Sequence, residues 1–137
     1  GGGGLVSTAR DYARFCQMLL RGGALEGARI LRPQTFQLAT SNLLPPGLTV
    51  ALADGANGYG AGMQVVLPGL TTPGTEPPGS FGWSGQAGTT MWVDPVNRVY
   101  AVLMVQYLPG GAYPIYVEAR QAVYRDLLAQ GRVSSAL

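Results

Sequence analysis

Apolar positions recur at helical spacing near the start of this chain. Thr8, followed three residues later by Asp11, is a shortened form of the capping box that begins helices. Gly22 and Gly23 can take the left-handed conformation that ends a helix. The pattern therefore predicts a helix over residues 8–21, with one apolar side facing a core: Ala9, Tyr12, Ala13, Cys16, Leu19 and Leu20.

Two more helices are expected further along the chain. Residues 115–130 carry apolar positions on one side of a helix and are followed by Gly131. Pro33 suits a first helical position, so a helix of about two turns is expected from there to Ala39, after a short strand at residues 28–31. The side of the final helix that should face a core holds Tyr116, Ala119, Val123 and Leu127.

Strand signals occupy the second half of the chain. Residues 59–67 predict a strand, and the proline-rich residues 68–79 a surface loop. Residues 94–97 predict a tight turn, with a proline at its second position. Residues 99–105 form an unbroken apolar run rich in β-formers, which predicts a central strand covered on both faces. The final helix is expected to cover one face and helical structure upstream the other.

Residues 42–57 are expected to form a loop, because prolines, glycines and asparagines interrupt them. Leu48, Val50 and Leu52 within this loop are either a brief extended segment or the lining of a pocket, and the pattern leaves both open. Taken together, the elements predict an α+β fold in which antiparallel strands are flanked by helices, including a C-terminal helix. A length of 137 residues fits one domain that buries roughly two thirds of its unfolded surface.

The chain carries few charges. Charged residues make up 12% of the sequence and hydrophobic residues 47%, whereas an average soluble domain has about 25% charged residues. This composition favours a segment whose faces are covered by more protein, either upstream in the same polypeptide or in a companion chain.

Several partners are not expected. The net charge is +2 and the arginines are scattered, so no basic stripe for nucleic acid is visible. The single Cys16 permits no internal disulfide, and without histidine a structural zinc site cannot be assembled from Cys and His clusters. A membrane span needs an unbroken apolar run of about 18 residues, and the sequence contains no such run. We therefore expect no metal, no cofactor, no nucleic acid and no membrane.

Candidate chemistry lies in residues 79–95, a strand that passes through a bend into a second strand. Gly82, Gly85 and Gly88 interrupt this β-prone run. Because glycine weakens an ordinary strand, their presence suggests that a ligand or another backbone approaches closely. The alternative is a β-bulge or a barrel corner without chemistry.

This segment resembles the third sequence box of the penicillin-recognising serine hydrolases, the group of class C β-lactamases and family VIII carboxylesterases. In that box, phenylalanine and glycine precede Lys-Thr-Gly, His-x-Gly or Trp-x-Gly, and here Trp83-Ser84-Gly85 occupies it. Residues 92–95 fit the strand that follows. Residues 2–11, 22–31 and 58–62 also fit the family, in its order, although Gly1–Gly4 could instead be a disordered tail or a remnant of cloning.

The resemblance implies that residues 1–137 are the C-terminal part of a β-lactamase-like serine hydrolase domain. Members of that group use a serine in Ser-x-x-Lys and a tyrosine in Tyr-x-Asn. This chain has no lysine, no histidine and no Tyr-x-Asn, so neither that machinery nor a Ser-His-Asp triad can be built from it. The chain alone is expected to be inert, and its partner is the missing N-terminal portion or a companion chain that carries the nucleophile.

The resemblance also implies roles for the box. The backbone N–H of Gln86, the residue after the box glycine, corresponds to an oxyanion-hole donor, which is worth about 2.7 to 4 kcal/mol in acyl-transfer sites. Gly85 would let the acyl group approach without a Cβ clash. Ser84 would contact the substrate or pair within the sheet. Trp83 stands where β-lactamases usually have a lysine for the substrate carboxylate, which favours neutral esters unless the indole is a buried packing group.

The function predicted from these residues is hydrolysis of a small-molecule carboxylic ester through an acyl-enzyme, with this chain supplying the oxyanion strand. Two alternatives remain. The first is a non-catalytic binding or interaction module that keeps the β-lactamase-like fold, and the second is a β-lactamase or a D-amino-acid peptidase.

Overall fold

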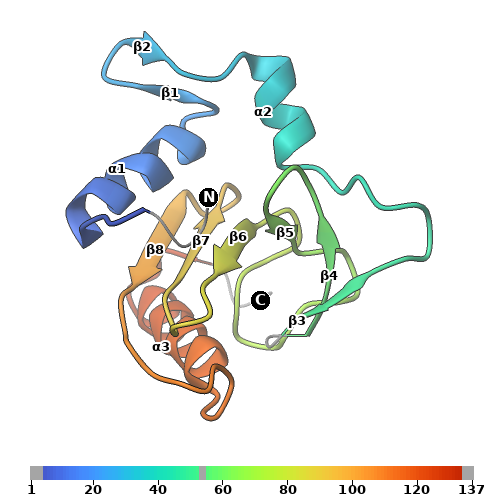
Figure 1. The fold of residues 1–137 in the computed structure, drawn as a ribbon, viewed down its shortest axis with the longest axis vertical. Coiled ribbons are helices and arrows are strands. Elements are labelled where there is room, and N and C mark those ends of the chain that lie inside the picture. Colours follow the sequence, from blue (N-terminus) through green and yellow to red (C-terminus); the bar gives the residue numbers. More distant parts are fainter. Residues whose placement is uncertain (1–4, 53–54, 134–137) are drawn as a thin grey trace.

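A six-stranded antiparallel sheet lies between helices in the computed structural model, which describes residues 5–52 and 55–133 (Figure 1). The strand order follows the sequence from β3 to β8. Helix α1, a small hairpin and α2 cover one face, and α3 covers the other. This arrangement confirms the predicted α+β fold with its antiparallel strands and C-terminal helix. The strands are β3 Val50–Leu52, β4 Gly55–Tyr59, β5 Gln64–Val65, β6 Phe81–Ser84, β7 Thr90–Asp94 and β8 Val99–Leu103.

Helix α1 (Ala9–Leu20) forms as predicted. The Thr8 side chain accepts a hydrogen bond from the backbone N–H of Asp11 at 3.1 Å, which satisfies one of the free donors at the helix start. Cys16 and Leu19 are buried against the sheet. Ala9 is exposed, in contrast to the prediction, because the buried side shifts toward Met18 as the helix reaches the sheet.

The hairpin of β1 (Ala24–Leu25) and β2 (Ala28–Arg29) follows, and then α2 (Pro33–Ala39). The strand predicted at residues 28–31 is therefore limited to two residues, because its partner β1 is equally short. Helix α2 is confirmed, and its Phe36 stacks edge-on against Phe81 of β6 with the ring centres 6.1 Å apart.

The loop predicted at residues 42–57 is wrong in part. Val50 pairs with Asn57 in an antiparallel ladder between β3 and β4, so the extended alternative applies to β3. The sequence of β4 (Gly55–Tyr59) has poor β-formers, and its strand structure comes from pairing with neighbours. The side chain of Asn42 accepts a hydrogen bond from the backbone N–H of Tyr59 at 3.0 Å and holds the end of β4 in place.

A continuous strand at residues 59–67 is also wrong. The chain bends after Tyr59 and returns as the two-residue strand β5, antiparallel to β4. A Cβ on Gly60 would lie 2.3 Å from the carbonyl oxygen of Ala39, and Gly62 has a φ of +93°. The glycines in this stretch therefore support a reversal packed against α2, where the sequence pattern alone predicted one twisted strand.

Strands β6 and β7 and the turns around them agree with the prediction. All five residues of β7 are buried, with Met91 and Val93 facing α1 and Trp92 facing α3. The turn after β7 is closed by a carboxylate oxygen of Asp94, which accepts a hydrogen bond from the backbone N–H of Asn97 at 2.9 Å.

Within the part of the chain that the structure describes, β8 pairs with β7 alone and lies at the edge of the sheet, where a central strand was predicted. Both of its faces are covered in part, since all five residues of the strand are half-buried. Tyr100 and Val102 pack on the α1 side, and Val99 and Ala101 pack on the α3 side. An unbroken apolar run indicates that both faces of a strand are covered. It does not indicate whether a strand has hydrogen-bonded neighbours on both sides or on one side only.

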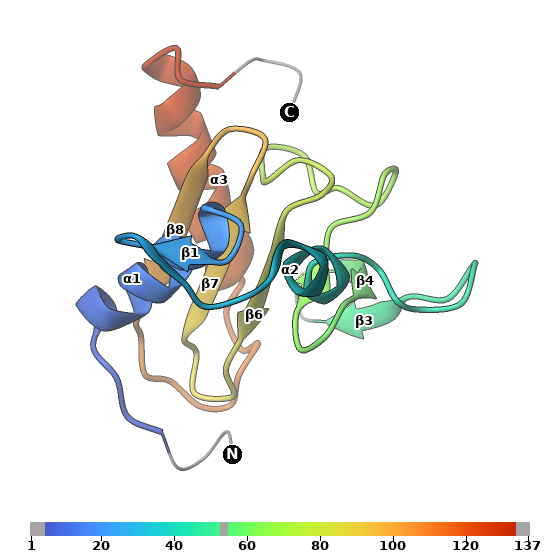
Figure 2. The same cartoon turned by 90° about the horizontal axis from the view of Figure 1, so that it is seen from above.

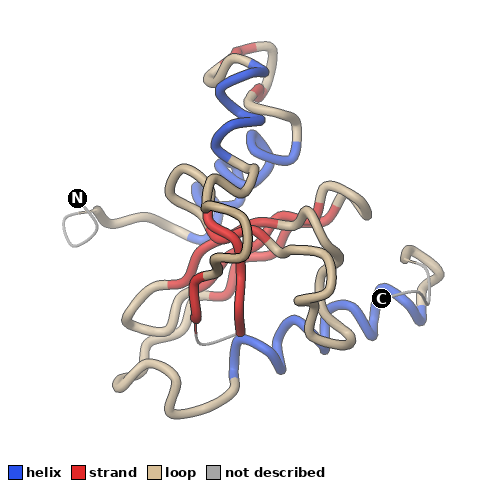
Figure 3. The backbone as a smooth tube through the Cα atoms, turned by 90° about the vertical axis from the view of Figure 1, so that its right-hand side faces the viewer, coloured by secondary structure: helices blue, strands red, loops and turns tan. Residues whose placement is uncertain are grey.

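Helix α3 (Ile115–Ala129) crosses the face opposite α1 (Figures 2 and 3). Tyr116 and Leu127 are buried as expected, but Arg120 and Tyr124 are buried as well. The guanidinium of Arg120 lies 5.2 Å from the ring centre of Trp92, and its Nε lies 3.0 Å from a carboxylate oxygen of Glu76. Helical spacing of apolar residues could not predict this buried charge.

The segment at residues 68–79 is therefore more than a surface loop. Thr75 and Glu76 are buried beneath α3, although its glycine and proline residues are mostly exposed or half-buried. The Glu76 carboxylate points inward and is the charge partner of Arg120. The predictions on Gly1–Gly4 fall outside the described residues. Among those that are described, no helix is both long and apolar enough to cross a membrane.

Candidate functional site

The candidate site begins where β6 ends. Trp83 pairs with Met91 and Ser84 with Thr90 across the β6–β7 ladder. The chain then turns back, with the N–H of Gly85 donating to the carbonyl of Thr89 at 2.7 Å and the N–H of Gly88 donating to the carbonyl of Gly85 at 3.1 Å. The predicted bend is thus a tight hairpin turn that carries Gln86 near its tip.

Trp83 is 39% exposed and stands edge-on to Tyr59, with the ring centres 5.4 Å apart. It is therefore not the fully buried packing group that was considered as an alternative. Tyr59 at the end of β4 supports one side of the indole and leaves part of its surface open.

Ser84 and Gly85 have local partners. The Ser84 hydroxyl donates to the Thr90 hydroxyl oxygen at 2.9 Å. Of the two roles expected for Ser84, substrate contact or pairing within the sheet, this contact is the pairing within the sheet. A Cβ on Gly85 would lie 2.6 Å from Oγ1 of Thr89, so a packing reason for glycine exists at this position.

Gln86 lies in the turn and outside any strand, and its side chain is exposed. No residue of the described chain accepts a hydrogen bond from its backbone N–H. The donor is therefore not consumed by sheet pairing, in contrast to an amide in the middle of a ladder.

A pocket of about 370 Å³ lies beside this turn. Trp83, Ser84 and Gly85 all line it, and Gln86 follows directly after them without being a lining residue. The remaining wall comes from the segment before α1, from α1 itself, and from β7, β8 and their ends: Leu5, Val6, Ser7, Tyr12, Thr89, Thr90, Met91, Val102 and Met104.

No local sequence pattern indicated that these residues would form the remaining wall. Tyr12 was expected in the core, yet it borders the pocket from α1. Burial, and then the neighbouring Cys16, raise the pKa of the Tyr12 phenol, so it is neutral near pH 7. Segments that are far apart in sequence meet here because α1 packs across β7 and β8, and such a meeting depends on tertiary structure.

The chemistry of the lining is mainly apolar with a few hydroxyls. Trp83, Met91, Val102 and Met104 offer hydrocarbon, sulfur and aromatic surface, and the lining residues include no carboxylate and no cation. A mostly apolar wall with a few polar groups is typical of small-molecule sites. This wall holds hydrogen-bond donors, but no base that could activate a nucleophile. The described residues contain no cluster of His, Cys, Asp or Glu that could hold a metal ion.

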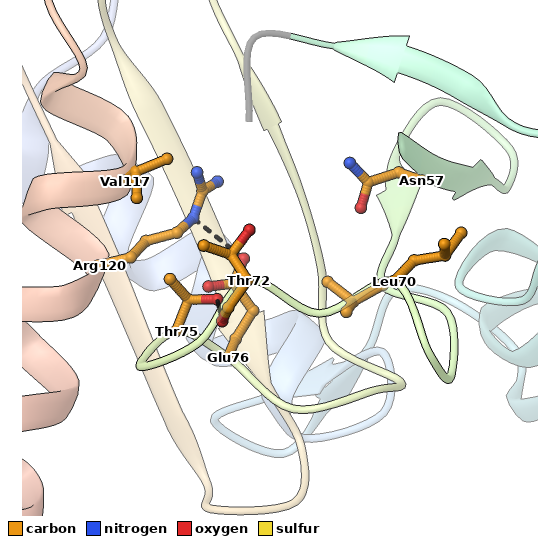
Figure 4. A pocket seen from close by; sticks show the side chains of 8 residues that line it. Asn57, Leu70, Thr72, Thr75, Glu76, Val117 and Arg120 are labelled. Carbon is orange, nitrogen blue, oxygen red and sulfur yellow. Dashed lines mark hydrogen bonds and ion pairs between the residues drawn. The ribbon is translucent and has the colours of Figure 1, made fainter. Parts of the chain in front are cut away.

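A second, smaller pocket of about 20 Å³ adjoins the Arg120–Glu76 ion pair beneath α3 (Figure 4). Thr72, Thr75 and Val117 also border it. Arg120 and Glu76 point toward each other across this space, so the pair links α3 to the loop at residues 68–79. We assign this pocket to the packing of α3.

Comparison with known proteins agrees with this fold. Residues 1–125 match the Beta-lactamase family, and the chain therefore belongs to that family of serine hydrolases. Protein Rv1367c of Mycobacterium tuberculosis strain H37Rv is 34% identical over 130 residues, a match that covers 89% of this chain and 31% of that protein. The uncharacterized protein MT1414 of strain CDC 1551 matches equally well.

Solved structures show the same relation. A β-lactamase, Mb2281c, from Mycobacterium bovis has a TM-score of 0.67 and 26% identity over 93% of this chain and 45% of its own. A penicillin-binding protein homolog from Caulobacter crescentus has a TM-score of 0.67 and 26% identity over 88% of this chain and 32% of its own.

Simvastatin synthase from Aspergillus terreus, with a TM-score of 0.68 and 18% identity over 86% of this chain and 34% of its own, shares the fold. The chain thus spans about a third of the curated relatives. It corresponds to the C-terminal portion of the family fold, as the sequence motifs predicted.

Proposed function

We propose that this chain is the C-terminal part of a serine carboxylesterase, and that the complete protein cleaves neutral carboxylic esters through an acyl-enzyme. The observation that carries the proposal is the backbone N–H of Gln86, which has no acceptor among the described residues and directly follows the pocket residues Trp83, Ser84 and Gly85. The nucleophile and its base would come from the upstream portion or from a companion chain.

In this reaction, the serine oxygen forms a bond to the ester carbonyl carbon and the carbonyl electron pair moves to its oxygen. The Gln86 N–H would donate a hydrogen bond to that oxyanion, where a preorganised donor gains strength as charge develops. Collapse of the intermediate breaks the bond to the alcohol, which leaves with the proton taken from the serine. Water then attacks the acyl-enzyme and releases the carboxylic acid.

Trp83 supports the choice of a neutral ester. Its indole offers one uncharged N–H on a large apolar body and cannot form an ion pair with a substrate carboxylate. Its exposed part borders the pocket next to Met91, so an apolar acyl or alcohol group would find a matching surface there. The polar contacts of the pocket come from uncharged hydroxyls and backbone groups.

The first experiment is labelling of the complete protein with an active-site phosphonate, followed by peptide mass spectrometry. We expect modification of one serine in an upstream Ser-x-x-Lys sequence and loss of ester hydrolysis in step with labelling. The control is the variant in which that serine is replaced by alanine. A protein that hydrolyses no ester and whose serines all stay unmodified would contradict the proposal and favour a non-catalytic binding module.

The second experiment tests the substrate class. The complete protein should turn over a p-nitrophenyl ester much faster than a cephalosporin, because the cephalosporin carries a carboxylate that Trp83 cannot pair with. Trp83→Lys should lower the ratio of the two kcat/KM values by about tenfold or more, the effect of one charge-assisted contact of about 1.5–3 kcal/mol. A cephalosporin preferred by the unsubstituted protein would instead identify a β-lactamase.

A further inference from the structure

Helix α3 reaches the candidate oxyanion turn from behind the sheet. Tyr116, the second residue of α3, is 6% exposed, and its hydroxyl donates a hydrogen bond to the backbone carbonyl of Gly85 at 3.1 Å. Later residues of α3, Tyr124 and Leu127, pack on the sheet face of Trp92, whereas the pocket is bordered by Met91 and by Tyr12 of α1. Tyr116 therefore contacts the turn without lining the pocket.

The contact acts on the same peptide unit that carries the Gln86 N–H. The carbonyl of Gly85 and the N–H of Gln86 belong to one planar trans peptide, in which the C=O and N–H bonds point in opposite directions. A donor that holds the carbonyl therefore fixes the direction of the N–H, which points away from the Tyr116 hydroxyl.

This peptide needs such support because glycine precedes it. Gly85 has no Cβ to restrict its backbone, so the peptide plane has more freedom to rotate than after another residue. The carbonyl accepts from the N–H of Gly88 at 3.1 Å within the turn, and the Tyr116 hydroxyl adds a second donor from outside it. A hydrogen bond to a carbonyl also polarises its peptide and strengthens the N–H as a donor.

From this geometry we propose that Tyr116 is a positioning residue for the oxyanion donor. It holds the Gly85–Gln86 peptide plane so that the Gln86 N–H is preorganised before the substrate arrives. The inference rests on the proposed function for its catalytic consequence, while the positioning of the amide can be measured without catalysis.

The test is Tyr116→Phe in the complete protein, which removes the hydroxyl and keeps the ring. We expect kcat for a p-nitrophenyl ester to fall about tenfold, equivalent to 1.4 kcal/mol of transition-state stabilisation, with KM unchanged. Affinity for a boronic acid, whose tetrahedral adduct resembles the oxyanion intermediate, should fall by the same factor. A group that acts only in the transition state changes kcat and analogue binding together.

Tyr124→Phe is the matched control. Tyr124 lies on the same helix, is similarly buried, and donates its hydroxyl to the Asp94 carboxylate at 2.8 Å, far along the chain from Gly85. We expect this variant to lose thermal stability and to keep the kcat of the unsubstituted protein. Equal losses of kcat in both variants would show a general packing effect of α3 and would overturn the positioning role.

A second readout is independent of activity. With selective 15N-glutamine labelling of the complete protein, the Gln86 amide resonance should move in Tyr116→Phe and stay in place in Tyr124→Phe. An unmoved resonance together with unchanged kcat would overturn the inference. If the unsubstituted protein hydrolyses no ester and no serine is labelled, the proposed function fails, whereas a shifted Gln86 resonance would still support the amide-positioning part.

Discussion

At the scale of single residues, the three glycines of the β6–β7 region serve different purposes. A Cβ on Gly82 would lie 2.2 Å from the carbonyl oxygen of Met91, so here one backbone approaches another. Gly88 has a φ of +96°, and a Cβ added to it would lie 2.7 Å from the ring of Tyr107. Only Gly85 borders the pocket. A glycine-rich motif therefore marks crowding and turning as well as access for a ligand.

The first prediction follows from these contacts. Gly82→Ala should lower the free energy of unfolding by about 1–3 kcal/mol, because the added methyl meets rigid backbone. Gly85→Ala should cost less, since its main obstacle is the Thr89 hydroxyl, which can rotate away. Urea denaturation of both variants measures the difference. Equal losses, or a larger loss for Gly85→Ala, would contradict the packing argument.

The second prediction concerns Cys16, which is fully buried. Burial raises the pKa of its thiol from 9.0 to about 11. Because the thiolate is the reactive form, this higher pKa lowers the thiolate population near pH 8 about 100-fold relative to the unfolded chain. Native protein should therefore leave Cys16 unmodified by iodoacetamide, and guanidinium should expose it, as peptide mass spectrometry would show.

The raised pKa of Cys16 also determines how the stability of the protein changes with pH. Burial favours the neutral thiol, so the stability associated with Cys16 is complete below about pH 9 and is lost as the pH rises through about 11. The variant Cys16→Ala should lose less stability than the unsubstituted protein over that interval. Rapid labelling of Cys16 in native protein at pH 8 would show that the thiol is accessible and would contradict both expectations.

At the scale of elements, α3 is attached to the sheet by polar contacts as well as by apolar packing. Arg120 pairs with Glu76 from the loop at residues 68–79 and stacks over Trp92, and Tyr124 donates to Asp94 at the end of β7. Glu76 lies in the loop, whereas Trp92 and Asp94 both lie in β7, so α3 joins the loop to the middle and the end of that strand. Tyr116 adds the turn between β6 and β7 to these attachments.

The third prediction tests the buried pair. Glu76→Ala should lower the free energy of unfolding by about 3–5 kcal/mol, because it leaves the Arg120 charge buried without its carboxylate. Glu26→Ala is the control, since it breaks an ion pair with Arg14 in which both side chains are about half exposed. Water solvates both ions there, so urea denaturation should detect little change. Similar losses in the two variants would contradict this account.

At the scale of the whole molecule, the chain exposes apolar surface around its pocket. Leu5 is 86% exposed and Val6 fully exposed, and Met104 is 43% exposed. The sequence also holds only 12% charged residues, and the chain spans about a third of its curated relatives. These observations agree with the proposal that further protein covers the pocket side.

The fourth prediction belongs to this scale. Residues 1–137 produced alone should hydrolyse a p-nitrophenyl ester no faster than buffer, because the chain has neither a lysine nor a histidine to serve as base. The complete protein should be active under the same conditions, and its active-site serine variant should not. Hydrolysis by the 137-residue chain, after its purity is checked by mass spectrometry, would refute the assignment of the nucleophile to another segment.

Local patterns predicted several elements well. Helices α1, α2 and α3, the turn after β7 and the order β6–turn–β7 all follow from spacing, caps and turn residues, which depend on neighbours in sequence. The strand prediction at residues 59–67 failed because Gly60 packs against α2, a contact between distant segments. Likewise, nothing in the periodicity of α3 indicates that Arg120 is buried, since its partner Glu76 lies in a separate loop.

The amino-acid sequence by itself determined the family, the helix boundaries and the motif Trp83-Ser84-Gly85, because these depend on residue identity and short-range geometry. Tertiary structure alone decided the edge position of β8, the pocket between α1 and β6–β8, and the contact of Tyr116 with Gly85. Those features require segments far apart in the chain to meet. The packing that brings them together is a property of the whole fold, and no local pattern encodes it.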